Sequence, residues 1–189
     1  VSDMTEEGIS AMVIAPVDPY GLSEELKAAK EAEIPVIAYD DLIMNTDALK
    51  YYVTFGGRQI GQLIGQEIID KEELEKLQEE KGSKTIEFLM GSLDDTQALF
   101  FYNGLMEKLQ PYLDDGTLVC KSGQITFEET GILRWSMDEA QSRAEDILEE
   151  AYQDGEAPDI ICTGFDGAAE GAVNALQNNG LTPGENWPM

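Results

Sequence analysis

The stretch "EIPVIAYDDLI", residues Glu33 to Ile43, decides the fold of this chain. Strand-forming residues 35–40 make a short apolar run that ends in two adjacent carboxylates, Asp40 and Asp41. The preceding residues 22–32 carry apolar side chains at the spacing of a helix. A helix followed by a buried strand is typical of a parallel sheet, and ligands of such sheets bind beyond the carboxyl ends of the strands.

The same alternation of strand and helix continues along the whole chain. Strands are predicted at residues 11–16, 35–40, 51–55, 85–91, 116–123 and 158–164. Helices are predicted at residues 22–32, 58–69, from about 96 to 113, 136–155 and 166–180. The acidic segment 70–81 reads as a solvated extension of the preceding helix. Strict alternation of this kind predicts an α/β protein with parallel sheets and helical crossovers.

The pair Gly56-Gly57 divides this pattern into two parts. Only two or three strands precede the pair, too few to close a domain, and three strand–helix units follow it. We therefore expect two lobes, residues 1–56 and 57–189. Both sheets are incomplete on this interpretation, and the chain is expected to be a fragment of a longer protein.

Composition excludes several classes of function. The 189 residues include 38 acidic and 12 basic side chains and no histidine, for a net charge of −26. Such a balance argues against partners that are nucleic acids or anionic membranes. Without histidine, and without a nucleophile or phosphate-loop motif, the sequence predicts no enzyme, no cofactor and no metal site. The apolar runs are also too short to span a bilayer.

The two cysteines are expected to be free thiols. In a sheet ordered 2-1-3, the strands that carry Cys120 and Cys162 flank a central strand at residues 85–90. Two strand spacings separate them by roughly 9–10 Å, which is beyond the reach of a disulfide.

Polar and aromatic side chains follow nearly every predicted strand, and they form the candidate site. Trp135 with Arg134 beside it has the character of a sugar platform, because an aromatic face stacks on a pyranose while charged groups bind its hydroxyls. Simpler roles are also open: helix caps for Asp95 and Asp166, a turn for Asp40-Asp41, and a hydrophobic staple for Trp135. The candidate ligand-binding residues are Asp40, Asp41, Asp95, Gln97, Arg134, Trp135, Phe165 and Asp166.

Five segments together resemble a known family. They are "VIAYDDLI", "YYVTF", "GSLDDTQALFFYNGLM", "SGQITFEETGILRW" and "GFDGAAEGAVNAL". In order and spacing they are similar to the type I periplasmic sugar-binding proteins of ABC importers, above all to multiple-sugar receptors and xylose-binding proteins. The resemblance implies two doubly wound α/β lobes joined by a hinge, with a monosaccharide, an aldopentose or aldohexose, held between them. It also implies delivery to ABC permease subunits by an exported protein, either periplasmic or anchored as a lipoprotein.

The resemblance also implies roles for individual residues. Asp40 matches the family's sugar-binding aspartate, whereas Asp41 stands where the family usually has arginine, and Gly56-Gly57 replaces an Asp-Asn pair. Asp95 and Gln97 lie where the family carries an acid followed by amides. Trp135 matches the aromatic residue that stacks on the sugar ring, and Arg134 lies next to it. Phe165 occupies a position where the family has asparagine or an aromatic residue. Asp166 matches an acid of the family.

Two other functions fit the same fold and residues. The first is the effector-sensing module of a sugar-responsive transcription regulator, which a basic helix-turn-helix before residue 1 would indicate. The second is a glycoside hydrolase that uses Asp40 and Asp41 as its carboxylate pair.

Overall fold

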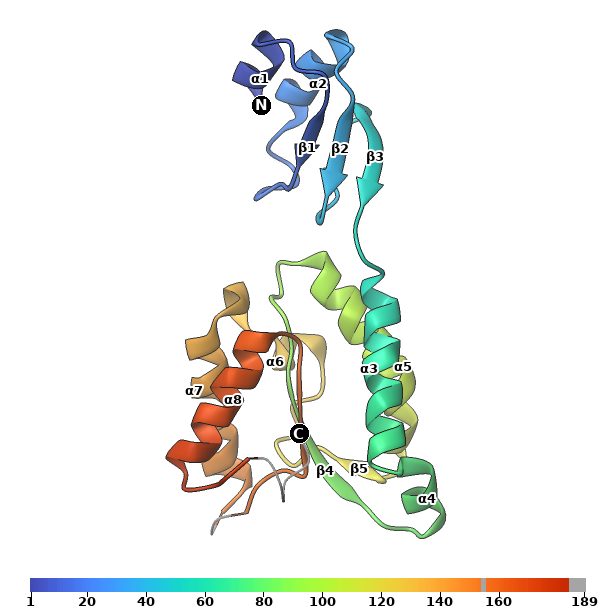
Figure 1. Cartoon of the computed structure of the whole chain (residues 1–189). Coiled ribbons are helices and arrows are strands. Elements are labelled where there is room, and N and C mark those ends of the chain that lie inside the picture. Colours follow the sequence, from blue (N-terminus) through green and yellow to red (C-terminus); the bar gives the residue numbers. More distant parts are fainter. Residues whose placement is uncertain (154–155, 184–189) are drawn as a thin grey trace. The chain divides into compact units, whose positions relative to one another are not determined.

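The computed structural model describes residues 1–153 and 156–183, and the chain forms two compact units, Val1–Gly56 and Gly57–Met189 (Figure 1). Each unit contains its own three-stranded parallel sheet. The predicted α/β class with parallel sheets is therefore confirmed.

Unit 1, residues 1–56, has a sheet of order β1-β2-β3. The buried side chains of β2, Val36 and Ala38, pack with Leu26 and Ala29 of α2. On the other face of the sheet, the side chain of Tyr51 on β3 is 59% exposed. The elements are α1 (Ser2–Glu6), β1 (Met12–Ile14), α2 (Ser23–Glu31), β2 (Val36–Tyr39) and β3 (Leu49–Val53).

Unit 2 has a sheet of order β5-β4-β6, with β4 in the centre as the sequence predicted. Its first half comprises α3 (Gly57–Lys71), α4 (Leu74–Glu79), β4 (Lys84–Leu89), α5 (Thr96–Asp114) and β5 (Leu118–Val119). Its second half comprises α6 (Phe127–Thr130), the 3₁₀ helix η1 (Leu133–Trp135), α7 (Met137–Ala151), β6 (Ile160–Thr163) and α8 (Asp166–Asn178).

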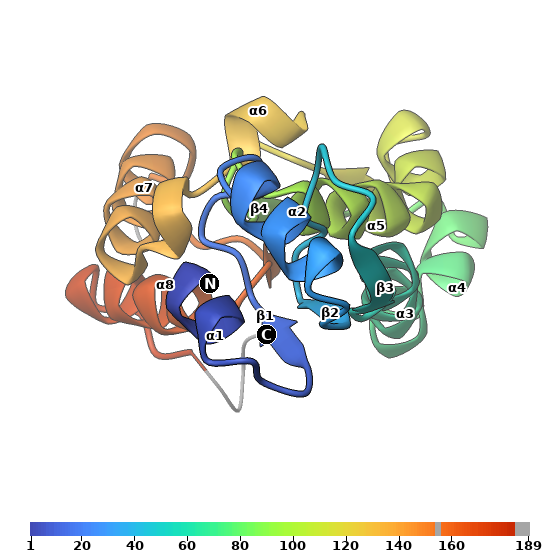
Figure 2. The ribbon, with the colours of Figure 1, turned by 90° about the horizontal axis from the view of Figure 1, so that it is seen from above.

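Helices cover both faces of the sheet in unit 2 (Figure 2). Alternate side chains of β4 point to opposite faces, so Ile86 and Phe88 join the cluster that includes Leu105 and Leu109 of α5. Leu89 joins a second cluster built from the small and aliphatic side chains of α7 and α8. Unit 2 is therefore a three-layer α/β/α sandwich, which fixes the carboxyl ends of its strands in place.

A close helix crossing holds one of these layers together. Gly57, Gly61 and Gly65 recur at every fourth position on the face of α3 that meets α5. A methyl group on Gly61 would lie 2.0 Å from the carbonyl oxygen of Phe101, and one on Gly104 would lie 2.0 Å from that of Arg58. The two backbones are thus in contact, and any side chain larger than hydrogen would separate them.

Three predictions were wrong by more than the one or two residues by which the ends of elements ordinarily vary. The acidic segment does not simply extend α3, because Glu73 adopts a positive φ of 48° and the new helix α4 begins by burying Leu74 completely. The strand predicted at 116–123 is shortened to the two residues of β5. Beyond it, the backbone N–H of Ser122 donates to the side chain of Glu87 and not to the backbone of a neighbouring strand.

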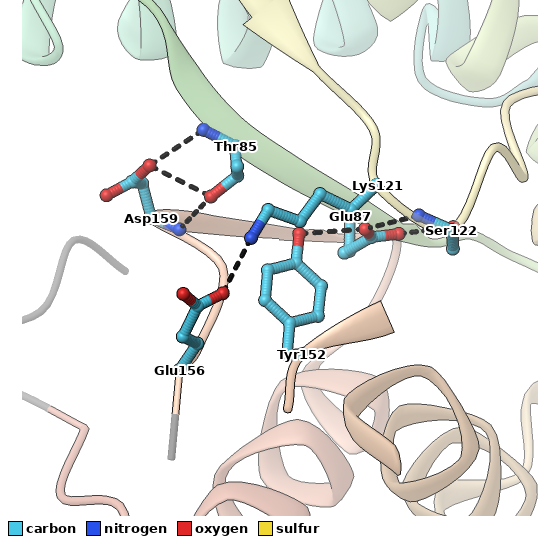
Figure 3. A network of polar contacts seen from close by, with 7 residues as sticks. All are labelled: Thr85, Glu87, Lys121, Ser122, Tyr152, Glu156 and Asp159. Carbon is cyan, nitrogen blue, oxygen red and sulfur yellow. Dashed lines mark hydrogen bonds and ion pairs between the residues drawn. The ribbon is translucent and has the colours of Figure 1, made fainter. Parts of the chain in front are cut away.

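The helix predicted at 136–155 ends at Ala151. Tyr152 leaves the helical conformation, and its hydroxyl donates a 2.9 Å hydrogen bond to the carboxylate of Glu87 in the sheet (Figure 3). This tertiary bond explains the earlier end. Gly155, the expected terminal glycine, lies outside the described residues.

Both cysteines are free, as predicted. Burial raises the pKa of the Cys120 thiol to about 11 and that of Cys162 to about 12, so both are protonated at neutral pH. Across residues 1–153 and 156–183 we find no helix with the length and apolar character needed to cross a membrane.

Candidate functional site

Two aromatic rings stand together at the carboxyl-end edge of the sheet in unit 2. Trp135 of η1 and Phe165, which directly precedes α8, pack edge to face, with ring centroids 5.3 Å apart and an interplanar angle of 83°. Trp135 is 37% exposed and Phe165 is half-buried. We call this pair the aromatic shelf. It joins two elements that the sequence places 30 residues apart, and it leaves part of an indole open to a ligand.

The backbone that presents the indole is strained. Arg134 and Trp135 have positive φ angles of 56° and 55°, a left-handed conformation that costs a residue other than glycine about 1–2 kcal/mol. Strain of this kind persists only where surrounding contacts impose it, and it clusters at binding sites. Two such residues in succession, one of them the candidate stacking aromatic, therefore strengthen the case for a site here.

Charged groups flank the shelf within unit 2. Arg134 and Asp166 are both exposed, and each is the chain neighbour of a shelf residue. Asp166 is the first residue of α8 and not its cap, since Phe165 holds the cap position, so the capping role considered for Asp166 is wrong. An exposed carboxylate and guanidinium beside an aromatic face can exchange hydrogen bonds with the hydroxyls of a sugar.

Asp95 and Gln97 lie at the start of α5. Asp95 is the helix cap, and its carboxylate accepts a 2.7 Å hydrogen bond from the backbone N–H of Gln97, so the simpler role foreseen for Asp95 is confirmed. A methyl group on Gly91 would lie 2.4 Å from the indole of Trp135 and 2.8 Å from Ala98, so the first turn of α5 adjoins the shelf. Asp95 retains a second carboxylate oxygen for a ligand.

Asp40 and Asp41 form a separate group in unit 1. They occupy a bend at the end of β2, where Asp40 is exposed and has a φ of 69°. The hydroxyl of Tyr52 donates a 2.9 Å hydrogen bond to the backbone carbonyl of Asp40, which fixes the bend and leaves the Asp40 side chain outside it. The pair thus forms a turn, as considered from the sequence, and also presents a carboxylate at the strand end.

Two residues next to the shelf are not among the candidate ligand-binding residues predicted from the sequence. Gly91 supports the indole, and the Ser92 hydroxyl accepts a 2.8 Å hydrogen bond from the backbone N–H of Arg134. The spacing of a short "GS" pair gives no sign of such a contact across 42 residues. In the described part of the chain, no group of three or more His, Cys, Asp or Glu side chains is placed to hold a metal ion.

Parallel α/β units with aromatic and charged side chains at the carboxyl ends of their strands are typical of small-ligand-binding proteins of the α/β class. Comparison with known families makes the class specific. The family described as periplasmic binding protein domain matches residues 1–186, and the chain belongs to this family. The resemblance inferred from the five sequence segments is therefore confirmed.

Several relatives of the chain are sugar-binding proteins by name. It is 39% identical over 190 residues to the multiple sugar-binding periplasmic receptor ChvE of Rhizobium radiobacter, covering 100% of this chain and 52% of the receptor. It is 29% identical over 184 residues to the D-xylose-binding periplasmic protein of Escherichia coli, covering 96% of this chain and 49% of that protein. The chain thus spans about half the length of the curated relatives it matches.

A solved structure shows the same likeness. The crystal structure of an ABC transporter solute-binding protein from Clostridium phytofermentans, with bound β-D-glucose, is 40% identical to this chain, with a TM-score of 0.84. The match covers 99% of this chain and 56% of that protein.

Proposed function

We propose that this chain binds a monosaccharide as part of the solute-binding component of an ABC sugar transporter. The observation that carries the proposal is the partly exposed aromatic shelf, flanked by Arg134 and Asp166, in a member of the periplasmic binding protein domain family. One face of an aromatic ring stacks on the C–H groups of a sugar, and the flanking charges bind its hydroxyls.

The roles of the polar residues follow from their chemistry. Carboxylates accept hydrogen bonds from hydroxyls, so Asp40, Asp41, Asp95 and Asp166 serve as acceptors. Arg134 donates, and Gln97 can do both. These roles are assigned within each unit separately, to Asp40 and Asp41 in unit 1 and to the other four residues in unit 2.

The ligand class we propose is an aldopentose or aldohexose. The names of the relatives support this range: a multiple-sugar receptor, a D-xylose-binding protein and a solute-binding protein with bound glucose. We further propose that the whole protein is exported, that it is periplasmic or held at the outer face of the membrane as a lipoprotein, and that it delivers the sugar to permease subunits.

Isothermal titration calorimetry with D-glucose, D-galactose, D-xylose, L-arabinose and D-ribose tests the proposal. We expect saturable binding of at least one sugar and more than a tenfold loss of affinity in Trp135→Ala, since a central aromatic contact usually dominates such a site. Tyr51→Ala is the matched control, because Tyr51 is an exposed aromatic on a strand of unit 1 and is not a candidate site residue. Binding that survives Trp135→Ala unchanged would contradict the role of the shelf.

The binding role also predicts that the sugar is released unchanged. Incubation with nitrophenyl glycosides should give no turnover, and turnover abolished by Asp40→Asn would instead support the hydrolase. The three relatives described above are receptors or binding proteins by name, so they give the regulator no support.

A further inference from the structure

The segment that ends in Trp135 is tied to the central strand by buried polar groups. We call residues 120–135 the arm; it leaves the sheet after the two-residue strand β5 and contains only the short helices α6 and η1. Glu87 of β4 is 2% exposed and Ser92, just beyond β4, is 1% exposed. Burying such polar groups is costly unless they are hydrogen-bonded. Both side chains accept hydrogen bonds from residues of the arm.

Glu87 holds the base of the arm. Its carboxylate accepts hydrogen bonds from the backbone N–H of Ser122 at 3.1 Å, from the Ser122 hydroxyl at 2.5 Å and from the Cys120 thiol at 3.4 Å. The Tyr152 hydroxyl adds a fourth donor from the end of α7 (Figure 3). Every one of these partners is a donor, so the cluster is arranged around a carboxylate acceptor.

Backbone hydrogen bonds hold the middle of the arm. The N–H of Met90 donates to the carbonyl of Thr130 at 2.7 Å, and the carbonyl of Gly91 accepts from the N–H of Ile132 at 3.1 Å. The arm therefore runs alongside the continuation of β4 after β5 has ended.

Ser92 holds the tip. Its hydroxyl accepts the N–H of Arg134 at 2.8 Å and donates to the carboxylate of Asp94 at 2.5 Å. Immediately below, the indole of Trp135 lies on Gly91, where a methyl group would come within 2.4 Å of the ring. The Ser92 hydroxyl thus binds the backbone of Arg134, the first of the two left-handed residues. Because Gly91 has no side chain, the indole of Trp135 can lie against its backbone.

We propose that Ser92 is a positioning residue for sugar binding: its hydroxyl, with the space at Gly91, holds Arg134 and Trp135 in the left-handed conformation that presents the indole. Glu87 fixes the base of the same arm. The inference rests on the proposed function for its consequence, a change in sugar affinity, but the positioning itself is visible in the protein without ligand.

The test uses the full chain with Trp187→Phe, which leaves Trp135 as its single tryptophan. Acrylamide quenching of tryptophan fluorescence then reports on this indole alone, and calorimetry with D-glucose and D-xylose reports on affinity. We expect Ser92→Ala to increase quenching without ligand and to weaken affinity roughly tenfold, the effect of one lost buried hydrogen bond. Gln66→Ala is the control, because it removes a part-buried hydrogen bond with Lys108 that does not involve the arm.

A second variant keeps the test decisive if Ser92→Ala does not fold. Gly91→Ala retains the hydroxyl but places a methyl group in the space of the indole, and it should also increase quenching and weaken affinity. Adding Trp135→Phe, which removes the overlapping ring, should restore part of the stability lost in Gly91→Ala, while the close contact with Ala98 remains.

The positioning role of Ser92 and the proposed sugar-binding function can be contradicted separately. Unchanged quenching in both Ser92→Ala and Gly91→Ala would overturn the positioning role, whatever sugar the chain binds. If the unaltered chain binds neither sugar but both variants change quenching, the positioning role stands and the proposed function fails for these sugars.

Discussion

Asp95 caps helix α5 with one carboxylate oxygen, and we also propose it as an acceptor for a sugar hydroxyl. The two roles respond differently to substitution. Asp95→Ala removes the cap and should lower the free energy of unfolding by about 1 kcal/mol, whereas Asp95→Asn retains a capping oxygen and should change it by a few tenths at most. Urea unfolding followed by circular dichroism measures both.

The asparagine variant then isolates the ligand role. If Asp95 binds a sugar through its charge, Asp95→Asn should weaken sugar affinity while leaving stability near that of the unaltered chain. Equal affinity in the two proteins would limit Asp95 to the cap.

At the scale of elements, the crossing of α3 and α5 predicts an unusual response to a small substitution. Alanine normally stabilises a helix relative to glycine by about 1 kcal/mol. In Gly61→Ala the added methyl would meet the Phe101 carbonyl, so the helices must separate, and we expect a net loss of about 2 kcal/mol in the free energy of unfolding.

Leu63→Ala on the same helix is the control for this measurement. Leu63 is 70% exposed, so its truncation should change stability by less than about 0.5 kcal/mol. A stabilised Gly61→Ala protein would show that the backbones can part at no cost.

Helix α6 predicts a pH dependence. Thr126 and Glu129 form a capping box, and hydrogen bonds from the Thr126 backbone and hydroxyl lower the pKa of Glu129 below its ordinary 4.5. A carboxyl whose pKa is lower in the folded state contributes stability above pH 4.5, and that contribution disappears as the pH falls through the folded value. Glu129→Ala should therefore destabilise the protein at pH 7 and have little effect near pH 3. Urea unfolding at pH 7 and at pH 3 measures the difference in stability between the two proteins. A difference that persists at pH 3 would show that the ionised carboxylate is not its cause.

Sequence periodicity predicted most of the elements because they are locally determined. The apolar stripe of α3 and the run of β4 depend on residues within one turn or one strand. The breaks depend on distant partners: Tyr152 leaves α7 to reach Glu87, 65 residues away in sequence. Likewise Trp135 was identified as a candidate from its type, but its left-handed backbone depends on Ser92, 42 residues from Arg134. Residue types therefore indicated the site, and tertiary hydrogen bonds that no local pattern contains determine its geometry.

At the scale of the whole molecule, the dominant feature is charge. A net charge of −26 on 189 residues repels itself in the compact state, and the printed sequence offers only 12 cations to offset 38 anions. Added salt shortens the screening length from about 30 Å at 0.01 M to about 10 Å at 0.1 M. We expect the melting temperature to rise by about 3 °C between these concentrations of sodium chloride, as about 1 kcal/mol of repulsion is relieved.

Choline chloride distinguishes screening from specific binding of sodium. An equal rise with both salts would support screening of the acidic surface. A rise with sodium alone, or a fall with either salt, would contradict the electrostatic explanation.

The protonated state of both native thiols has a practical consequence for labelling. A maleimide dye reacts with a thiolate, and Cys120 and Cys162 have pKa values of about 11 and 12, so they should stay silent in the folded protein at neutral pH. A cysteine introduced at Leu133, which is 56% exposed and lies two residues before Trp135, would then be the only reactive one. A single substitution would thus place a dye beside the aromatic shelf, with no need to remove a native cysteine first.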